Sequence, residues 1–185
     1  MNKKGTWGLW VSVILVIILI LLIFFYFTLF SPRNEKLYSG DKALVNPISG
    51  LSHEEAISQF NESFITYLLY EIKAYNLHNP PLSGDTPKIL VFVGDDSYGA
   101  EIDAGSIYVH KGGIEGQDII IRTSKEESVN MLSNEDYVKE SFQNGKSNIE
   151  LAASKSVLFG KGYLSLYEQL TGKSVTGSVI RIYSD

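Results

Sequence analysis

Apolar residues dominate one end of the chain. From Trp7 to Phe30, 24 consecutive residues carry no charge, and most are Val, Ile, Leu or Phe. As an α-helix this run would extend for roughly 36 Å, which exceeds the ~30 Å hydrocarbon core of a bilayer. No polar face interrupts it, although a long helix on the surface of a soluble protein would show one. The pattern therefore predicts a transmembrane helix over residues 7–30, behind a short tail of residues 1–6.

The apolar run has two other interpretations, a cleaved signal peptide and a helix buried in a soluble core. A cleaved signal peptide has a shorter apolar region, of about 7–15 residues, and ends at small side chains. Here the run ends in bulky residues between Phe27 and Pro32. A helix buried in a soluble core would need surrounding elements that the rest of the chain does not supply. Lys3 and Lys4 precede the run without any acid, which slightly favours a cytoplasmic N-terminus, an external domain and a single-pass membrane location.

Residues 31–51 show no helical or strand period and contain two prolines, so they are predicted to be a linker. The following residues, 52–185, have the length of one domain. All 21 acidic residues and 14 of the 16 basic residues lie in 31–185, which gives that part a formal charge of 14 − 21 = −7. Phosphate backbones repel such a domain, so nucleic acid is excluded as a partner.

The domain alternates between helical and strand patterns. A capping box at Ser52 to Glu55 opens an amphipathic pattern that predicts one helix to His78. Strand patterns follow at 89–93, 98–102, 106–110 and 118–123, with a hairpin turn at Asp103-Ala104-Gly105. Further helices begin at Ser124, Ser133 and Ser154; strands are predicted at 147–152 and 175–183. The predicted fold class is α+β, a mainly antiparallel sheet of about five strands covered by helices and preceded by the one transmembrane helix.

The sequence shows no motif for a metal site or for a catalytic site. Three histidines and no cysteine are present, and no two histidines have a metal-ligand spacing. The acids between Asp95 and Asp103 lack the order of a helix–loop–helix calcium site. No Gly-x-Ser-x-Gly motif marks a nucleophile. We therefore expect neither an enzyme nor a protein with a metal or a cofactor.

Between about Ile89 and Leu170 the order of features resembles the sterol carrier protein type 2 family. The resemblance rests on the hairpin from Tyr98 to Val109, on the strand 118–123 followed by a capped helix, and on the Gly145-Lys146 entry into the strand that ends at Leu151. The family often has Gly-Asp or Gly-Asn after that strand, where this chain has Ala152-Ala153.

Resemblance to this family implies an apolar tunnel that binds acyl chains, sterols or isoprenoids without chemistry. Seven residues from the C-terminal part of the match would line it: Phe142, Leu151, Leu158, Tyr163, Leu166, Tyr167 and Leu170. The same residues would equally form an ordinary filled core. Two functions follow: a membrane-tethered lipid-binding module, with a lipid ligand and the bilayer as partners, or an interaction domain of a membrane assembly.

Overall fold

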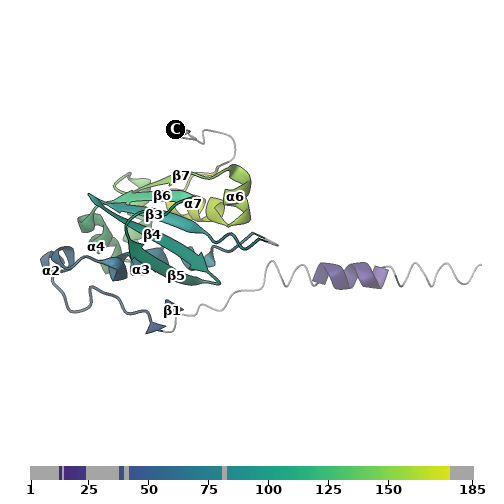
Figure 1. The fold of residues 1–185 in the computed structure, drawn as a ribbon, viewed down its shortest axis with the longest axis horizontal. Coiled ribbons are helices and arrows are strands. Elements are labelled where there is room, and N and C mark those ends of the chain that lie inside the picture. The colour runs from purple at the N-terminus through teal and green to yellow at the C-terminus, as the bar shows by residue number, and fades with distance from the viewer. Residues whose placement is uncertain (1–12, 14, 24–37, 40–41, 81–82, 176–185) are drawn as a thin grey trace, which may run out of the picture. The chain divides into compact units, whose positions relative to one another are not determined.

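A computed structural model describes residues 13, 15–23, 38–39, 42–80 and 83–175 (Figure 1). The chain divides into two compact units, residues 1–36 and residues 37–185. In the first unit the described residues, 13 and 15–23, are helical. Over the described parts of the chain, no helix has the length and apolarity needed to span a membrane.

The predicted transmembrane helix over residues 7–30 is therefore wrong as an element of the fold. An apolar run reports how favourable the transfer of its side chains out of water is, but it does not determine how far a helix continues. The residues of that run outside 13 and 15–23 are not among those described. The predicted orientation of the N-terminus stays a prediction.

The second unit has α+β architecture. Its elements are β1 (Tyr38–Ser39), β2 (Lys42–Ala43), α2 (His53–Ser58), α3 (Glu62–Glu71), the 3-10 helix η1 (Ala74–Asn76), β3 (Lys88–Val93), β4 (Asp96–Asp103), β5 (Ser106–Lys111), β6 (Ile119–Thr123), α4 (Lys125–Ser133), α5 (Tyr137–Gln143), β7 (Asn148–Leu151), α6 (Lys155–Gly160) and α7 (Tyr163–Thr171).

Five strands form one mixed sheet in the order β5-β4-β3-β6-β7, and β1 pairs with β2 separately. The central pair β3–β6 is parallel, whereas the other three pairs are antiparallel. In this order the hairpin of β4 and β5 lies on one side of β3, and the antiparallel pair β6–β7, which α4 and α5 connect, lies on the other. The turn between β4 and β5 is the predicted one: Ala104 and Gly105 both have positive φ, 48° and 86°, as a tight two-residue hairpin turn requires.

One face of the sheet is covered by the helices (Figure 1). Alternate residues of β3 point to that face and are fully buried, and the adjacent β6 contributes Ile119 and Ile121 in register with them. Together with apolar side chains of the helices they form a single hydrophobic core. The opposite face is not covered by helices, and there Arg122 lies 4.5 Å over the Phe92 ring and pairs with Glu150 at 2.8 Å.

Two helices predicted as continuous are divided in the structure. The capping box at Ser52 and Glu55 forms, with both reciprocal hydrogen bonds, but α2 is only six residues long. A new helix, α3, begins at Glu62 because the Asn61 side chain accepts from the Ser63 amide at 2.9 Å and caps it. The last predicted helix likewise divides into α6 and α7 at Gly162, whose φ of +88° no helical residue adopts.

Two predicted segments fall partly or wholly outside the described residues. Of the predicted linker 31–51, residues 38–39 and 42–43 form β1 and β2, and the side-chain amide of Asn46 donates to the Leu132 carbonyl of α4 at 3.1 Å. The predicted last strand, 175–183, lies outside the described residues except for Val175.

Candidate functional site

The seven predicted ligand-binding residues lie on the helical side of the β6–β7 end of the sheet. They come from α5, β7, α6 and α7, and all belong to or pack against the hydrophobic core. Five are buried, with exposed fractions from 0% for Leu158 and Tyr163 to 6% for Phe142, while Leu151 and Tyr167 are half-buried. The structure therefore brings these residues into one part of the core, and it tests neither a ligand nor a tunnel.

The α7 helix shows why these side chains gather there. Its buried residues Tyr163, Leu166 and Leu170 follow steps of three and four, so they form one stripe along the helix. Under this stripe the inner face of β6 and β7 presents Ile119, Ile121, Ile149 and Leu151, which are paired across the two strands. We call the side chains between these strands and α5, α6 and α7 the apolar layer.

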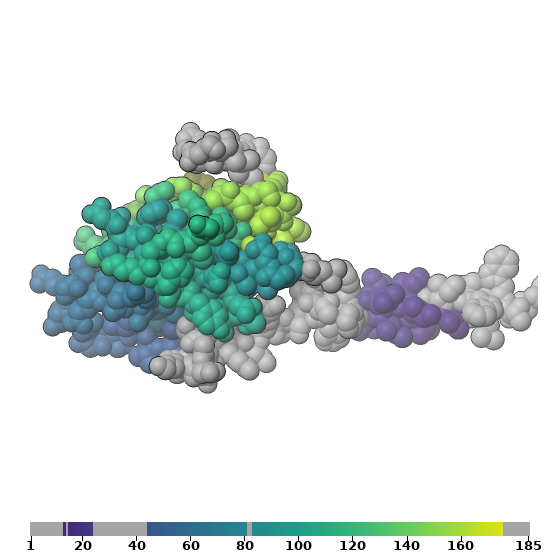
Figure 2. Space-filling model, viewed as in Figure 1, coloured from purple at the N-terminus to yellow at the C-terminus, as the bar shows by residue number. Residues whose placement is uncertain are grey.

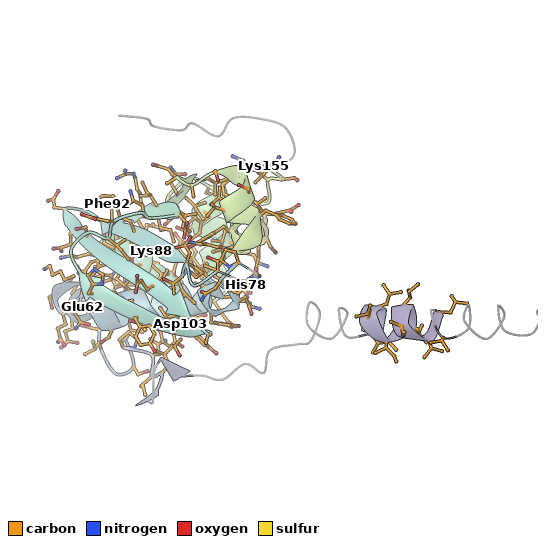
Figure 3. All side chains as sticks on the ribbon, turned by 45° about the vertical axis from the view of Figure 1, so that its right-hand side comes forward. Glu62, His78, Lys88, Phe92, Asp103 and Lys155 are labelled. Carbon is orange, nitrogen blue, oxygen red and sulfur yellow. The ribbon has the colours of Figure 1, made fainter. Side chains whose placement is uncertain are left out.

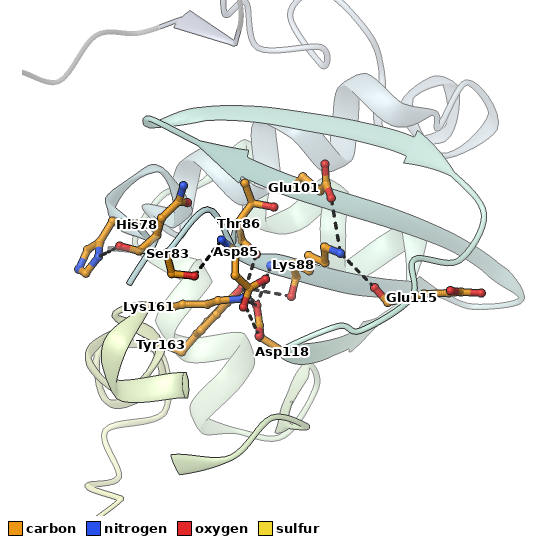
Figure 4. A network of polar contacts seen from close by, with 11 residues as sticks. His78, Ser83, Asp85, Thr86, Lys88, Glu101, Glu115, Asp118, Lys161 and Tyr163 are labelled. Carbon is orange, nitrogen blue, oxygen red and sulfur yellow. Dashed lines mark hydrogen bonds and ion pairs between the residues drawn. The ribbon is translucent and has the colours of Figure 1, made fainter. Parts of the chain in front are cut away.

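A buried ion pair stands at one end of the apolar layer (Figure 4). The Lys161 side chain is 1% exposed, and its Nζ donates to Asp118 Oδ1 and Oδ2 at 3.1 and 3.0 Å, to the Thr86 carbonyl at 2.9 Å and to Asp85 Oδ2 at 2.8 Å. Three acceptor groups thus match the three protons of the ammonium. Lys161 is held at the junction of α6 and α7, whereas Asp118 precedes β6 and Asp85 precedes β3.

Asp118 is the centre of this cluster. Besides the Lys161 ammonium, its Oδ2 accepts from the Lys88 amide at 2.8 Å and from the Tyr163 hydroxyl at 3.1 Å, and its carbonyl accepts from the amides of Ala152 and Ala153. Burial raises the pKa of the Tyr163 phenol far above its ordinary value, and the Asp118 charge acts in the same direction. Tyr163 is therefore a neutral hydrogen-bond donor at physiological pH. We call Lys161, Asp118, Tyr163 and Asp85 the lysine cluster.

A second polar cluster stands at the other end of the layer. The buried Ser141 hydroxyl of α5 donates to the Glu127 carboxylate of α4 at 3.0 Å and lies 2.9 Å from the buried Ser147 hydroxyl. Ser147 in turn lies 2.9 Å from the Thr123 hydroxyl at the end of β6. Tyr137 also donates to Glu127, at 3.1 Å. The Glu127 carboxylate is bonded to these hydroxyls, and Ser124 caps α4 by accepting from the Glu127 amide.

The two clusters define the extent of the apolar layer. Asp118 directly precedes β6 and Thr123 ends it, so five residue steps at about 3.3 Å separate them by roughly 17 Å. Since β7 runs antiparallel to β6, its ends meet the same two clusters: Ser147 precedes it, and Ala152, bonded to Asp118, follows it. Between the clusters, the residues facing the helices from both strands are apolar.

The sequence did not point to the residues of the lysine cluster. Lys161 lies between Gly160 and Gly162, where an exposed loop lysine would be the ordinary expectation. Its main partner is 43 residues away, so no local spacing relates the two. Of the histidines, His78 contacts the Asn79 carbonyl and His110 the Gly113 carbonyl, both through ring nitrogens. Within the described residues no group of three or more His, Cys, Asp or Glu side chains is arranged to hold a metal.

Comparisons with known proteins give few matches. No protein-family model matches the chain, and no curated protein sequence matches it. Among solved structures, a double mutant of the sec-alkyl sulfatase PisA1 is similar with a TM-score of 0.40 and 10% identity, over 69% of this chain and 19% of the sulfatase. The ubiquinone synthesis protein UbiJ-SCP2 is similar with a TM-score of 0.34 and 13% identity, over 59% of this chain and 86% of that one. This chain thus spans about a fifth of the sulfatase.

The resemblance to the sterol carrier protein type 2 family stays a prediction, because no family model matches and the neighbour named UbiJ-SCP2 has a TM-score of only 0.34.

Proposed function

We propose that residues 37–185 form a non-catalytic module that binds an acyl chain or a similarly elongated apolar ligand in the apolar layer. One observation carries the proposal: a purely apolar layer, roughly 17 Å long by the strand rise, is closed at each end by a polar cluster whose hydrogen bonds are made within the protein. Binding sites for apolar ligands have such apolar walls and few, fixed polar groups.

A ligand enters the layer by separating α7 from the edge strand β7. Leu151 of β7 and Tyr167 of α7 are the two predicted wall residues that are only half-buried, so they mark the boundary between the layer and solvent. The wall residues behind them are 0–6% exposed, which means that the unliganded layer is closed and opens with the ligand. Among the described residues no strand lies beyond β7 in the sheet, so no described backbone ladder would have to break on that side.

The polar clusters support a non-catalytic role. Lys161 has each of its protons engaged, and the Tyr163 phenol stays protonated because burial and the Asp118 charge raise its pKa. A general base or nucleophile needs a free lone pair within reach of a substrate. In both clusters the polar groups form hydrogen bonds with one another and fix the two ends of the layer.

Fluorescent fatty acid titrated into the delipidated full-length chain tests the proposal. Leu151→Trp fills the layer from its half-buried edge, and we expect it to weaken uptake roughly tenfold, since losing about 1.4 kcal/mol of apolar contact between ligand and wall lowers the affinity by that factor. The matched control is Ile120→Trp, because Ile120 is also half-buried but lies on the opposite face of the sheet. Circular dichroism checks that both variants fold. The proposal fails if the wild-type chain takes up no fatty acid, or if both variants lose uptake equally.

A second candidate is an interaction domain with a permanently filled core. The low exposure of the wall residues favours it, because a packed core needs no ligand. It predicts that protein purified without added lipid carries none by native mass spectrometry, and that the delipidated chain binds no fluorescent fatty acid. A copurified acyl or isoprenoid ligand near one per chain would exclude it.

A further inference from the structure

The short helix α6 presents an aromatic side chain to solvent. Phe159 is 75% exposed, the largest exposed fraction among the large hydrophobic residues described; within the second unit Val45 at 73% and Tyr108 at 53% follow. An isolated exposed apolar residue needs no explanation by itself. Phe159 differs because the preceding residue, Leu158, is fully buried in the apolar layer. Two adjacent residues of α6 therefore face the proposed ligand layer and the solvent: Leu158 is buried in the layer, and Phe159 is exposed.

The segment of the chain that carries Phe159 contains no acidic residue. From Leu151 to Tyr167 the sequence contains two lysines and no Asp or Glu. Lys161 is buried, so Lys155 is the exposed charge of this segment; it is the first residue of α6 (Figure 3). The neighbouring exposed side chains, Ser154 and Ser156, are small hydroxyls within hydrogen-bond distance of each other. In the space-filling view α6 and α7 form a yellow-green corner of the domain (Figure 2).

The tip of α6 is also held in place. An added Cβ on Gly160 would lie 3.7 Å from Pro80, so the end of the helix packs against the segment that precedes β3. The Lys161 carbonyl accepts from the His78 amide at 3.3 Å, and the Lys161 ammonium is fixed by the lysine cluster. Phe159 is thus exposed on a helix whose C-terminal end is fixed by contacts with the rest of the domain.

We propose that the tip of α6, meaning Phe159 with Lys155, Ser154 and Ser156, docks on the surface of an anionic phospholipid bilayer. Phe159 enters the boundary between headgroups and acyl chains, while Lys155 meets the negative surface potential. No acid within 151–167 opposes this approach, and the exposed acid bonded to the segment, Asp85, is paired with the Lys161 ammonium. The inference rests on the proposed function for its purpose, because docking here would place the apolar layer beside the membrane that supplies its ligand.

A single fluorophore tests the docking directly. The chain has no cysteine, so Phe159→Cys in the full-length protein accepts one NBD label, and Tyr108→Cys on β5 is the matched exposed control. Vesicles of phosphatidylcholine with phosphatidylserine are added, with and without doxyl-labelled lipid. We expect the emission at position 159 to shift to the blue and to be quenched by doxyl lipid, and the emission at position 108 to stay unchanged. Because the reporter is local, contact of any other part of the chain with the vesicles does not produce this difference.

Three outcomes would overturn the proposal: no change at position 159, an equal change at both positions, or an equal response to vesicles of phosphatidylcholine alone. A second measurement separates docking from ligand binding. Phe159→Ser should slow transfer of fluorescent fatty acid from protein to anionic vesicles about tenfold, the loss expected from one buried aromatic ring, and leave the affinity in solution unchanged. If the wild-type chain binds no fatty acid while position 159 still inserts, the proposed function fails and the docking surface stands. If fatty acid binds and position 159 stays in water, docking fails alone.

Discussion

Replacing Lys161 by Met isolates the energetics of the lysine cluster. Met keeps the length of the apolar stem but removes the ammonium, which is 1% exposed and donates to Asp118, Asp85 and the Thr86 carbonyl. The Asp118 carboxylate, 3% exposed, would then keep only the Lys88 amide and the Tyr163 hydroxyl as donors. A buried carboxylate without its cation is the state that this substitution creates.

The size of the loss follows from the burial of each partner. Removing one member of a buried ion pair costs about 3–5 kcal/mol, because the remaining charge stays desolvated. The Asp85 side chain is 55% exposed, so its contact with Lys161 is screened and we expect Asp85→Asn to cost less than about 1 kcal/mol. A domain of this size has a total stability of about 5–15 kcal/mol. Lys161→Met therefore leaves a folded but strongly weakened protein, and Asp85→Asn is its matched control.

Urea unfolding followed by circular dichroism measures these effects. The set comprises the wild-type chain, Lys161→Met, Asp118→Asn, the corresponding double variant and Asp85→Asn. We expect the double variant to be less destabilised than the sum of the two single variants, because it contains neither buried charge. Strictly additive losses, or a loss below about 1 kcal/mol for Lys161→Met with an unchanged slope against urea, would refute the assignment of a coupled buried pair.

Three further predictions concern the turn, the uncovered sheet face and one carboxyl. Ala104→Asn should stabilise the domain by several tenths of a kcal/mol in urea unfolding, because Asn adopts the positive φ of 48° more readily than Ala; a loss would contradict this turn. Gly99→Ala should lower the free energy of unfolding by about 1–3 kcal/mol in the same assay, since its Cβ would lie 2.6 Å from His110 Nε2 and 2.8 Å from Ile114 Cβ. An unchanged free energy of unfolding would contradict this close packing, because it would mean that the segment with His110 and Ile114 moves away at no cost. Burial raises the pKa of Glu71 above its ordinary 4.5, so its ionisation opposes folding above that pH. Glu71→Gln should therefore melt above the wild type at pH 7, with the difference vanishing as the pH falls below 4.5; a constant difference would contradict the sign.

The positions of several strands could be predicted because their signals are local. The apolar run at β3, the turn at Asp103 to Gly105 and the apolar triplet of β6 each lie within a few residues. Helix boundaries were harder. The three- and four-residue spacing continues past Asn61, so it indicated one helix, although the Asn61 side chain caps a second one. The pattern of apolar positions does not report such a break, because both helices bury the same kind of face.

Less of the candidate site than of the fold could be predicted from the sequence. The stripe of Tyr163, Leu166 and Leu170 was visible as helical periodicity, and the structure places it in the core. The pairing of Lys161 with Asp118 was not visible, since it spans 43 residues and depends on the left-handed turn at Gly162. The predicted transmembrane helix failed for a related reason, because hydropathy describes the side chains of a segment and not the length of its helix.

Under the proposed function, the apolar layer would open at the boundary where separating the elements costs the least free energy. Opening at the end near β6 would separate Lys161 from Asp118 at a cost of about 3–5 kcal/mol, and the other end would expose the bonded hydroxyls of Ser141 and Ser147. Opening at the side, between β7 and the part of α7 that carries Tyr167, disturbs apolar contacts at residues that already touch solvent, while Tyr163 at the start of α7 stays bonded to Asp118. The layer should therefore admit a ligand from the side while both polar clusters remain intact. It follows that Lys161→Met should lower stability more than it alters ligand affinity, whereas Leu151→Trp should do the reverse.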